Sequence, residues 1–426
     1  MIVIIGLGTG GIYAARWISR FNRKERITII ERRSYETYSP CSIPLVVEGA
    51  IDLKEIIHPF PRTPRIDVLL EHEAVEIDTK GKKILYRKIG SKEMKEIEYD
   101  KLIYAAGARP SVPPIKGVEK KGVFTVRTVE DAKNINEWAK KAKKALVIGA
   151  GAIGMEMAYA LRKRGLDVTI VEMLEHPFPK ALDEDMAKIV KERLESMGIK
   201  CHCNSKVEEI LGKEKVKGAL VNGEEIDADM VILSVGVKPN TELLKGKVYM
   251  DDRGYIIVNE RMQTSLPDIF AVGDCARTPY GILQLATIAA REGIVAGINA
   301  AGGDAIYTKH TGAFVSAMGN FEVACVGERS EISGRGHSTI TPYSKHEIFV
   351  KIFTDKEGKI KGAQAVGYMA SKKIDIISAL MRGGGRIWDV AFMEHAYCPA
   401  SAHLYDVINI AANNAMRKIK IEKYTV

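Results

Sequence analysis

The sequence is poor in cysteine and tryptophan and has no long apolar run. Six cysteines among 426 residues are too few for a disulfide scaffold, so we expect a reducing, cytoplasmic location. Three tryptophans offer little aromatic surface on which nucleic-acid bases could stack. The longest apolar region, residues 282–301, is interrupted by Arg291 and Glu292, which argues against a membrane span. A strand-like run begins at Met1, so we expect no signal peptide.

The overall composition fits a folded protein of several domains. Hydrophobic residues make up 46% of the chain and charged residues 27%, which is enough to bury cores and excludes a disordered chain. At roughly 150 residues per domain, the length predicts two to three domains. Lys and Arg number 63 against 54 Asp and Glu, and the surplus of +9 indicates either an anionic partner or a solvated basic surface.

One pattern occurs twice along the chain. Residues 2–11 and 145–154 each read as an apolar strand that runs into a Gly-x-Gly-x-x-Gly turn. A helix-like stretch and a second strand follow each turn, and the second strand ends in an acid, Glu31 in one copy and Glu172 in the other. A single glycine motif is weak evidence, but the ordered series of strand, turn, helix, strand and acid, found twice, predicts two dinucleotide-binding folds.

Each glycine of this turn has a separate physical purpose. The first allows the tight turn, the second lets backbone N–H groups approach a pyrophosphate, and the third lets helix and strand pack closely. The acid accepts hydrogen bonds from an adenosine ribose. The glycines concerned are Gly6, Gly8 and Gly11 in the first copy, and Gly149, Gly151 and Gly154 in the second.

The repetition continues downstream and then stops. Residues 101–110 and 230–239 are each an apolar strand closed by a glycine turn and a basic residue followed by proline. Residues 266–276 then form a buried strand with Asp274 at its carboxyl end, which is the edge where ligands bind in open α/β sheets. From about Tyr307 the composition changes and no nucleotide motif recurs, so we expect a third, α+β domain with helices over residues 374–381 and 404–415.

The two glycine units, the Ala-Gly-Ala-Arg-Pro segment and the Val-Gly-Asp segment resemble the pyridine nucleotide-disulfide oxidoreductase family of flavoproteins. The resemblance implies two Rossmann-like α/β domains and a C-terminal α+β dimerisation domain. It places an FAD-binding domain at residues 1–112 and 239–305, an NAD(P)H-binding domain at 113–238, and the dimerisation domain at 306–426.

The resemblance also assigns cofactors to the two units. Asp274 would hydrogen-bond the ribityl chain of FAD, Glu31 the FAD ribose, and Glu172 the ribose of the nicotinamide nucleotide. No Arg follows Glu172 in residues 173–176 to receive a 2′-phosphate, which favours NADH. NADPH held by a distant Lys or Arg is the alternative. The residues implied in cofactor binding are Gly6, Gly8, Gly11, Glu31, Ser39, Cys41, Ala106, Gly107, Gly273, Asp274, Ala286, Gly149, Gly151, Gly154, Glu172 and Gly236.

The segment from Tyr38 to Pro44 contains one cysteine, Cys41, 30 residues after Gly11. Pro40 and Pro44 frame a helix start, and the backbone N–H groups there favour the nucleophilic thiolate. A buried structural cysteine is the alternative. No Cys-x4-Cys pair is present, so the chain resembles the single-cysteine branch, which includes CoA-disulfide reductase, NADH oxidase, NADH peroxidase and persulfide reductase. That branch usually has Asn where this sequence has Pro40.

Two further positions bear on the reaction. Peroxidase- and oxidase-type members carry His in the first glycine loop, where this sequence has Thr9, closer to the small residue of CoA-disulfide reductases. Residues 395–403 resemble the Ala-Tyr-Ala-Pro-Pro segment of those reductases. The resemblance implies a homodimer in which Tyr397 reaches Cys41 of the partner subunit and protonates a departing thiolate. A second family tyrosine falls near Tyr343.

Cys398, next to Tyr397, allows two interpretations. It is either a resolving thiol for Cys41 across the dimer or a small residue in place of the family's alanine. Together with His395 and His403 it lacks a fourth ligand for a zinc site, so we assign no metal.

The other cysteines and four arginines have simple interpretations. We expect Cys275 and Cys325 in the core, and Cys201-His202-Cys203 in a structural or surface role. Four arginines could contact an anionic substrate such as the CoA phosphates or could be ordinary surface residues: Arg16, Arg20, Arg62 and Arg65.

These observations predict an FAD-dependent NAD(P)H reductase of small-molecule disulfides or persulfides, most similar to CoA-disulfide reductase. CoA would be a substrate or an adduct on Cys41. One alternative is an NADH oxidase that forms water or peroxide, and the other is an electron-transfer flavoprotein that reduces a small redox protein. No nucleic-acid or membrane partner is expected.

Overall fold

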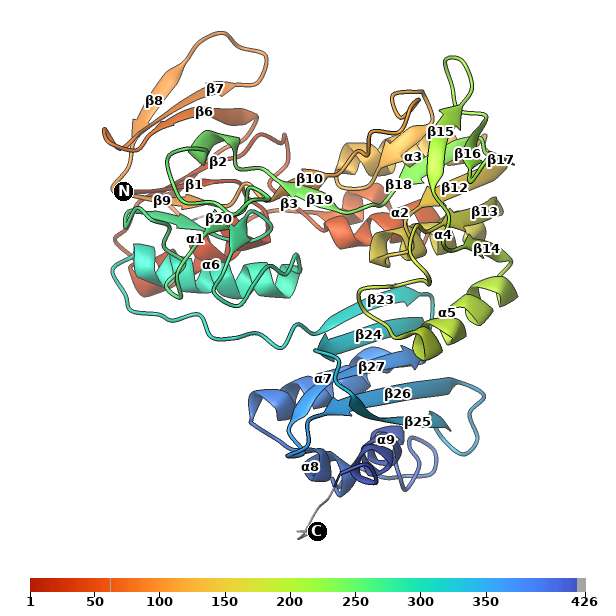
Figure 1. Ribbon diagram of the computed structural model, residues 1–426. Coiled ribbons are helices and arrows are strands. Elements are labelled where there is room, and N and C mark those ends of the chain that lie inside the picture. The colour runs from red at the N-terminus through yellow and green to blue at the C-terminus, as the bar shows by residue number, and fades with distance from the viewer. Residues whose placement is uncertain (62, 420–426) are drawn as a thin grey trace. The chain divides into compact units, whose positions relative to one another are not determined.

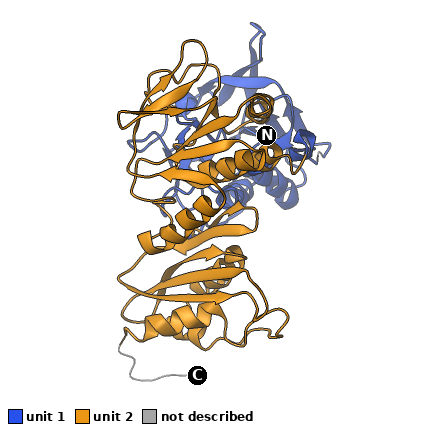
Figure 2. Ribbon diagram, turned by 90° about the vertical axis from the view of Figure 1, so that its right-hand side faces the viewer, with its two compact units in different colours: residues 1–42, 52–111, 236–310 blue, residues 43–51, 112–235, 311–426 orange. Residues whose placement is uncertain are grey.

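The computed structural model describes residues 1–61 and 63–419 (Figure 1), so Arg62 lies outside the described residues. The chain divides into two compact units (Figure 2). Unit 1 comprises Met1–Ser42, Asp52–Ser111 and Gly236–His310. Unit 2 comprises Ile43–Ile51, Val112–Val235 and the described part of Thr311–Val426.

Unit 1 is built on a five-stranded parallel sheet in the order β21-β9-β1-β2-β5. Its central strands are runs of buried aliphatic residues, as expected for a parallel sheet that is covered on both faces. The strands are β1 (Ile2–Ile5), β2 (Ile27–Ile30), β5 (Ile66–Leu69), β9 (Lys101–Tyr104) and β21 (Ile269–Ala271).

Two helices of unit 1, α1 (Thr9–Phe21) and α6 (Ala286–Ala300), pack against each other through glycines. A Cβ atom at Gly293 would lie 2.3 Å from the carbonyl oxygen of Gly10, and one at Gly297 would lie 2.6 Å from that of Ala14. The two backbones are therefore in direct contact, which only glycine permits.

Smaller antiparallel pieces and one short parallel pair complete unit 1. Strands β6 to β8 form a three-stranded sheet, and the two Arg/Lys-Pro exits, β10 and β19, pair with each other. These strands are β6 (His72–Asp78), β7 (Lys83–Lys88), β8 (Lys95–Glu98), β10 (Ala108–Pro110) and β19 (Val237–Pro239), with the short pairs β3 (Thr37–Tyr38) and β4 (Ile57–His58), and β20 (Ile256–Ile257) and β22 (Ala276–Arg277).

Unit 2 repeats the parallel sheet in the order β11-β18-β12-β13-β14. Strands β12, β13, β14 and β18 take the places of β1, β2, β5 and β9, so the duplication read from the sequence is confirmed in the fold. Its elements are β11 (Val123–Thr125), α3 (Val129–Ala139), β12 (Lys144–Ile148), α4 (Ala152–Lys163), β13 (Asp167–Val171), α5 (Glu184–Ser196), β14 (Ile199–His202), β15 (Val207–Leu211), β16 (Gly218–Val221), β17 (Glu224–Asp227) and β18 (Met230–Leu233).

The C-terminal part of unit 2 is an antiparallel sheet, in the order β23-β24-β27-β26-β25, packed against helices. This confirms the predicted α+β composition. The helix expected from Leu404 begins instead at Val407, because the Asp406 carboxylate accepts the Ile408 N–H at 3.1 Å and caps it there. The elements are β23 (Phe314–Met318), β24 (Phe321–Gly327), β25 (Ile332–Thr339), β26 (Glu347–Thr354), β27 (Ile360–Gly367), α7 (Ala370–Arg382), α8 (Ile387–Ala391) and α9 (Val407–Met416).

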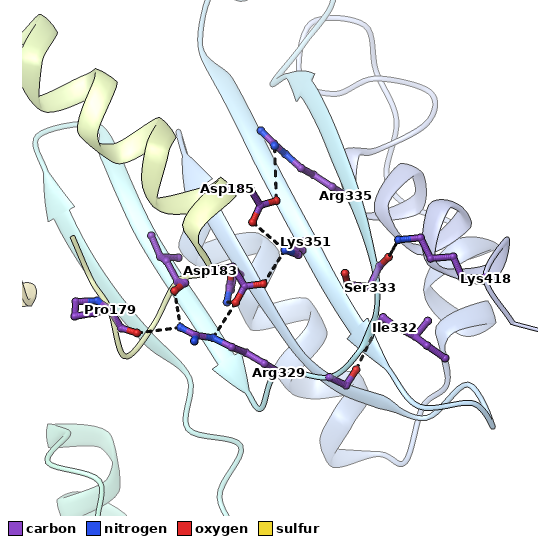
Figure 3. Close-up of polar contacts among 12 residues, drawn as sticks. Pro179, Asp183, Asp185, Arg329, Ile332, Ser333, Arg335, Lys351 and Lys418 are labelled. Carbon is purple, nitrogen blue, oxygen red and sulfur yellow. Dashed lines mark hydrogen bonds and ion pairs between the residues drawn. The ribbon is translucent and has the colours of Figure 1, made fainter. Parts of the chain in front are cut away.

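A cluster of charges ties this sheet to the start of α5 inside unit 2 (Figure 3). Lys351 Nζ lies 2.7 Å from Asp183 Oδ2 and 2.9 Å from Asp185 Oδ1, and Arg329 Nε lies 2.9 Å from Asp183 Oδ1. Burial would raise the pKa of Asp183, but the Lys351 and Gln364 hydrogen bonds and the two cations hold it below its usual value.

The predicted division into three domains stays a prediction.

Among the described residues, none of the helices combines the length and apolarity that crossing a membrane requires.

Candidate functional site

The first and third glycines of each turn are required by the fold itself. Gly6 and Gly149 have φ of +98° and +103°, in the left-handed region that favours glycine. A Cβ atom at Gly11 would lie 2.1 Å from the carbonyl oxygen of Gly6, and one at Gly154 would lie 2.0 Å from that of Gly149. Any larger residue at the third position would force the helix away from the strand.

The second glycines, Gly8 and Gly151, are not required by any protein contact. Apart from chain neighbours, no heavy atom within the described residues lies within 4 Å of a Cβ atom built at either position. Each residue is the N-cap of a helix, α1 or α4, and neither cap makes a side-chain hydrogen bond. Open space beside an uncapped helix N-terminus fits a dinucleotide pyrophosphate, and both turns therefore fit the cofactors predicted from the sequence.

The two acids lie beside these turns. The carboxylate of Glu31 accepts the Leu7 N–H at 2.7 Å, and that of Glu172 accepts the Ala150 N–H at 2.7 Å. Both side chains are buried, with 4% and 9% of their surface exposed. Each acid thus braces the residue between the first two glycines and is positioned beside the predicted adenosine site.

Among the described residues, Glu31 has a side-chain partner that Glu172 lacks. The guanidinium group of Arg33 donates from Nε to Oε1 of Glu31 at 2.8 Å and from Nη2 to Oε2 at 2.7 Å. Burial would raise the pKa of Glu31, but the hydrogen bonds and charge of Arg33 hold it below its usual value. Arg33 was not predicted as a functional residue, although a basic residue two positions after an acid is a visible signal.

The carboxyl edge of the unit 1 sheet gathers the other predicted FAD residues. Asp274 follows β21, and Gly273, with φ of +76°, turns the chain there. The Asn240 side chain donates to the Ala106 carbonyl oxygen at 3.0 Å, and the Asn240 N–H donates to the Gly107 carbonyl oxygen at 2.9 Å. Two further predicted residues are placed by the fold: Ala286 is the first residue of α6, and Gly236 accepts the Ser111 N–H.

Glu292 is a buried residue of this edge that sequence reasoning did not assign. Its Oε2 accepts the Gly273 N–H at 2.6 Å, and its side chain lies in α6 with 4% of the residue exposed. Burial raises the pKa of Glu292 to about 8. The signal was an acid within an apolar stretch, and such an acid must find a buried partner.

Cys41 is exposed and lies in a 3-10 turn, Pro40–Ser42, that leads into α2 (Ile43–Glu48). This confirms the helix start predicted between the two prolines. The Ser42 N–H donates to the Ser39 carbonyl oxygen at 3.0 Å, and the Ser39 hydroxyl lies 3.3 Å from Nε2 of His58. Cys41 is therefore not buried, and its predicted catalytic role stays a prediction.

Tyr397 lies in the connection between α8 and α9 and is 48% exposed. Tyr343, in another connection of the same sheet domain, is 81% exposed. Cys398 is also exposed, and His403 contacts the Thr339 hydroxyl at 3.0 Å.

The remaining cysteines have different environments. Cys275 is fully buried, as predicted, and its burial raises its pKa to about 12. Cys325 is half-buried within β24, and burial raises its pKa to about 11. Cys201 and Cys203 lie at the end of β14, with their Sγ atoms 3.8 Å apart. All six cysteines are described by the structure, and it contains no disulfide among them.

Two dinucleotide sheets with open glycine turns and buried acids, together with an exposed cysteine at a helix start, are the features of a flavin- and nicotinamide-dependent oxidoreductase. The profile of the pyridine nucleotide-disulphide oxidoreductase family matches residues 1–293, and the chain belongs to this family. It is therefore an FAD-dependent enzyme that uses NAD(P)H.

Relatives are similar over nearly their whole lengths. An NADH oxidase from Methanocaldococcus jannaschii is 38% identical, with 98% of this chain and 99% of the relative covered. A CoA-dependent NAD(P)H sulfur oxidoreductase from Pyrococcus furiosus is 33% identical, with 96% and 98% covered. The solved structure of an NAD-dependent persulfide reductase from A. fulgidus is 33% identical, with a TM-score of 0.92 over 98% of this chain and 83% of that one.

Proposed function

We propose that this enzyme is an NADH-dependent reductase of small-molecule disulfides or persulfides, most similar to CoA-disulfide reductase. The single observation that carries this proposal is the exposed Cys41 at a helix start that follows the first strand-helix-strand segment, β1-α1-β2, of unit 1. A thiol in this position is accessible to a dissolved substrate and close to backbone N–H groups that stabilise a thiolate.

In the proposed reaction, the Cys41 thiolate attacks a disulfide sulfur and forms a mixed disulfide, while one substrate thiolate departs. Bound FAD and NADH supply the two electrons that return the mixed disulfide to two thiols. Tyr397 of the partner subunit would give a proton to the departing thiolate, since a phenol can donate at that point.

Exposed apolar side chains support a homodimer through the C-terminal sheet domain. Tyr343, Tyr397, Leu404 and Tyr405 expose between 48% and 81% of their surfaces. The Thr339–His403 contact holds the two loops that carry them together. Such residues on one domain are typical of a surface that another chain covers.

A phosphate-bearing substrate is supported by the outer face of α1. Arg16 and Arg20 are exposed and one turn apart, with their guanidinium groups 5.8 and 5.1 Å from the ring centres of Tyr13 and Trp17. Arginines on aromatic rings suit an adenine nucleotide with phosphates, as CoA has. Arg65 is exposed and donates to a backbone carbonyl oxygen of Lys24 at 3.2 Å.

The competing function is an NADH oxidase, which the name of the Methanocaldococcus jannaschii relative favours. In this chain the loop residue is Thr9 rather than a histidine, so no imidazole is available there to support a cysteine sulfenic acid. The oxidase predicts rapid NADH consumption in air without any thiol substrate.

Replacement of the cysteine separates these functions. We expect Cys41→Ser to lower NADH-dependent reduction of CoA disulfide by about 10³-fold or more, because the nucleophile is lost. Reduction of ferricyanide by NADH should persist, since it needs only the flavin. Cys398→Ser, the other exposed cysteine, is the matched control and should retain disulfide reduction if Cys398 only replaces alanine. Full disulfide reduction by Cys41→Ser would refute the proposal.

Mass spectrometry of the unreduced protein provides a second test. A CoA adduct on Cys41 supports the disulfide reductase, whereas a sulfenic or sulfinic acid supports the oxidase.

A further inference from the structure

The Cys-x-Cys pair at the end of β14 is close enough to react. Cys201 lies in β14, and Cys203 directly follows His202, the last residue of that strand. Their Sγ atoms are 3.8 Å apart and share a hydrogen bond. Cys201 is 9% exposed and Cys203 is half-buried, so solutes reach the second thiol more easily than the first.

The segment that carries this pair is hydrogen-bonded to the loop of Glu172. The Glu172 N–H donates to the His202 carbonyl oxygen at 2.8 Å, and the Ser205 N–H donates to the Glu172 carbonyl oxygen at 2.9 Å. The Asn204 N–H donates to the Leu174 carbonyl oxygen at 2.9 Å. Any shift of the backbone at Cys203 is therefore passed to Glu172.

The same three backbone bonds exist in unit 1. There the Glu31 N–H donates to Leu69, the Glu71 N–H to Arg33 and the His72 N–H to Glu31, at 3.0, 2.9 and 3.0 Å. Glu71 and Asn204 also share a positive φ, 56° and 52°.

Aligned on these bonds, Cys201 and Cys203 stand where unit 1 has Val68 and Leu70. Two aliphatic side chains thus suffice for this backbone, and the fold gives no reason for two thiols.

The two thiols are suited to different roles. The hydrogen bond from Cys201 lowers the pKa of Cys203, and the same bond together with burial raises the pKa of Cys201. The charge of Lys191 also lowers the pKa of Cys203. Cys203 is the natural attacking thiolate, and Cys201 is the thiol that resolves the intermediate.

We propose that Cys201 and Cys203 form a redox-active dithiol that small-molecule disulfides oxidise, and that its oxidation weakens NADH binding through the Glu172 loop. The Cys203 thiolate attacks one sulfur of the disulfide RSSR, so that a Cys203–SR bond forms and RS⁻ departs. Cys201 loses its proton to solvent and attacks Cys203 Sγ, and the second RS⁻ departs. Two electrons pass from the dithiol to RSSR, which becomes two RSH after protonation.

The geometric consequence follows from the length of the new bond. A disulfide joins its sulfur atoms at about 2.05 Å, so the two Sγ atoms must approach by nearly half of their present separation. We expect the backbone of Cys203 to move with its sulfur. This movement would draw the Asn204 and Ser205 N–H groups away from the carbonyl oxygens to which they donate. The NADH part of the proposal rests on the proposed assignment of Glu172 to the nicotinamide nucleotide.

The test uses the full-length holoenzyme with Cys41→Ser, treated with glutathione disulfide as the probe. Alkylation and peptide mass spectrometry should show the loss of two hydrogens within residues 201–203. With Cys201→Ser added, a glutathione adduct should accumulate on Cys203, whereas Cys203→Ser should leave Cys201 without an adduct. Continued alkylation of both thiols after oxidant treatment would overturn the dithiol.

NADH affinity is then measured with ferricyanide as the electron acceptor, which does not need Cys41. Oxidation should raise the KM for NADH about tenfold, comparable to the loss of one good hydrogen bond. The matched control is C201V/C203L, which copies the unit 1 residues into unit 2 and should abolish the response to glutathione disulfide.

The outcomes separate this inference from the proposed function. A disulfide that forms and leaves the KM for NADH unchanged would refute the regulatory part. If Glu172→Gln also left that KM unchanged, the assignment of the nucleotide site would be wrong, whereas the disulfide would still be read directly from the peptide mass.

Discussion

The two nucleotide folds hold their acids with matching backbone bonds and surround them with different side chains. In unit 1, the carboxylate of Glu31 receives a two-pronged contact from Arg33 in addition to the Leu7 N–H. In unit 2, the carboxylate of Glu172 receives only the Ala150 and Leu174 N–H groups among the hydrogen bonds recorded for the described residues. The comparison indicates a rigid, charge-compensated acid in the fold proposed for FAD, and a less constrained acid in the fold proposed for the nicotinamide nucleotide, which must leave after each turnover.

The largest effect is expected at the third glycines, where the two folds should behave alike. Gly11→Ala and Gly154→Ala each place a Cβ atom against a backbone oxygen, at 2.1 and 2.0 Å. Because backbone must shift to relieve the contact, each should lower the free energy of unfolding by about 3 kcal/mol. Urea unfolding of each variant measures the loss.

The matched controls are Gly8→Ala and Gly151→Ala, where the new Cβ atom has no heavy atom of the described chain within 4 Å apart from chain neighbours. After flavin removal, Gly8→Ala should be as stable as the parent apoprotein. As purified, it should retain less FAD, which is measured by flavin absorbance. Gly151→Ala should raise only the KM for NADH. Equal destabilisation at all four glycines would contradict the separate roles of the third glycines in packing and of the second glycines in cofactor binding.

At the acids, the two folds should respond differently. Glu31→Gln leaves the guanidinium group of Arg33 without its carboxylate and should cost about 2 kcal/mol of stability, whereas Glu172→Gln should cost less than about 1 kcal/mol. Glu172→Gln should instead raise the KM for NADH about tenfold, measured with ferricyanide.

The free energy of unfolding measured at acid pH sharpens the contrast between Glu31 and Glu172. Because Arg33 holds the pKa of Glu31 below its unfolded value, the pair stabilises the fold above that unfolded value and loses its contribution as pH falls through the lowered pKa. Glu31→Gln should therefore match the parent protein in strong acid and fall behind it at neutral pH. A constant difference at all pH values would show that the pair is not responsible.

A small loss of stability is expected at the charge cluster of unit 2, because its residues are partly exposed to solvent. Asp183→Asn should cost about 1 kcal/mol at neutral pH and low salt, since solvent screens the contacts. The lowered pKa of Asp183 and the raised pKa of Lys351 confine the stabilisation to the range between them, so it fades in acid and again in strong alkali. Asp227→Asn, which breaks the exposed pair with Lys144, should change nothing measurable in urea unfolding. Equal losses of stability in the two variants would refute a stabilising role for the charge cluster.

The order of elements could be predicted because it depends on local patterns. Aliphatic strands, glycine turns and acids recur in the same order in both copies, and the fold follows them strand by strand. The start of α9 was predicted three residues early because the apolar pattern begins at Leu404, whereas the cap that ends the preceding loop is Asp406.

Partners that depend on tertiary approach could not be predicted. Nothing in the sequence around Glu292 shows that it accepts the N–H of Gly273, because that contact exists only once α6 packs beside β21. The equivalence of Cys201 and Cys203 with Val68 and Leu70 likewise emerges only from matching backbone hydrogen bonds. The number of residues between the acid and this segment differs between the two copies, so the sequence alone does not show the equivalence.

The glycine contact between α1 and α6 also sets an order of events during synthesis. Helix α1 begins at Thr9, but the helix that covers it begins at Ala286, after the whole of Val112–Val235. Domains fold as their chain emerges from the ribosome, at about 5–20 residues per second. The contiguous second fold can close its sheet while the first still waits for β21 and α6, with the apolar face of α1 uncovered. Of the two nucleotide folds, the one that begins first is therefore the later to be completed.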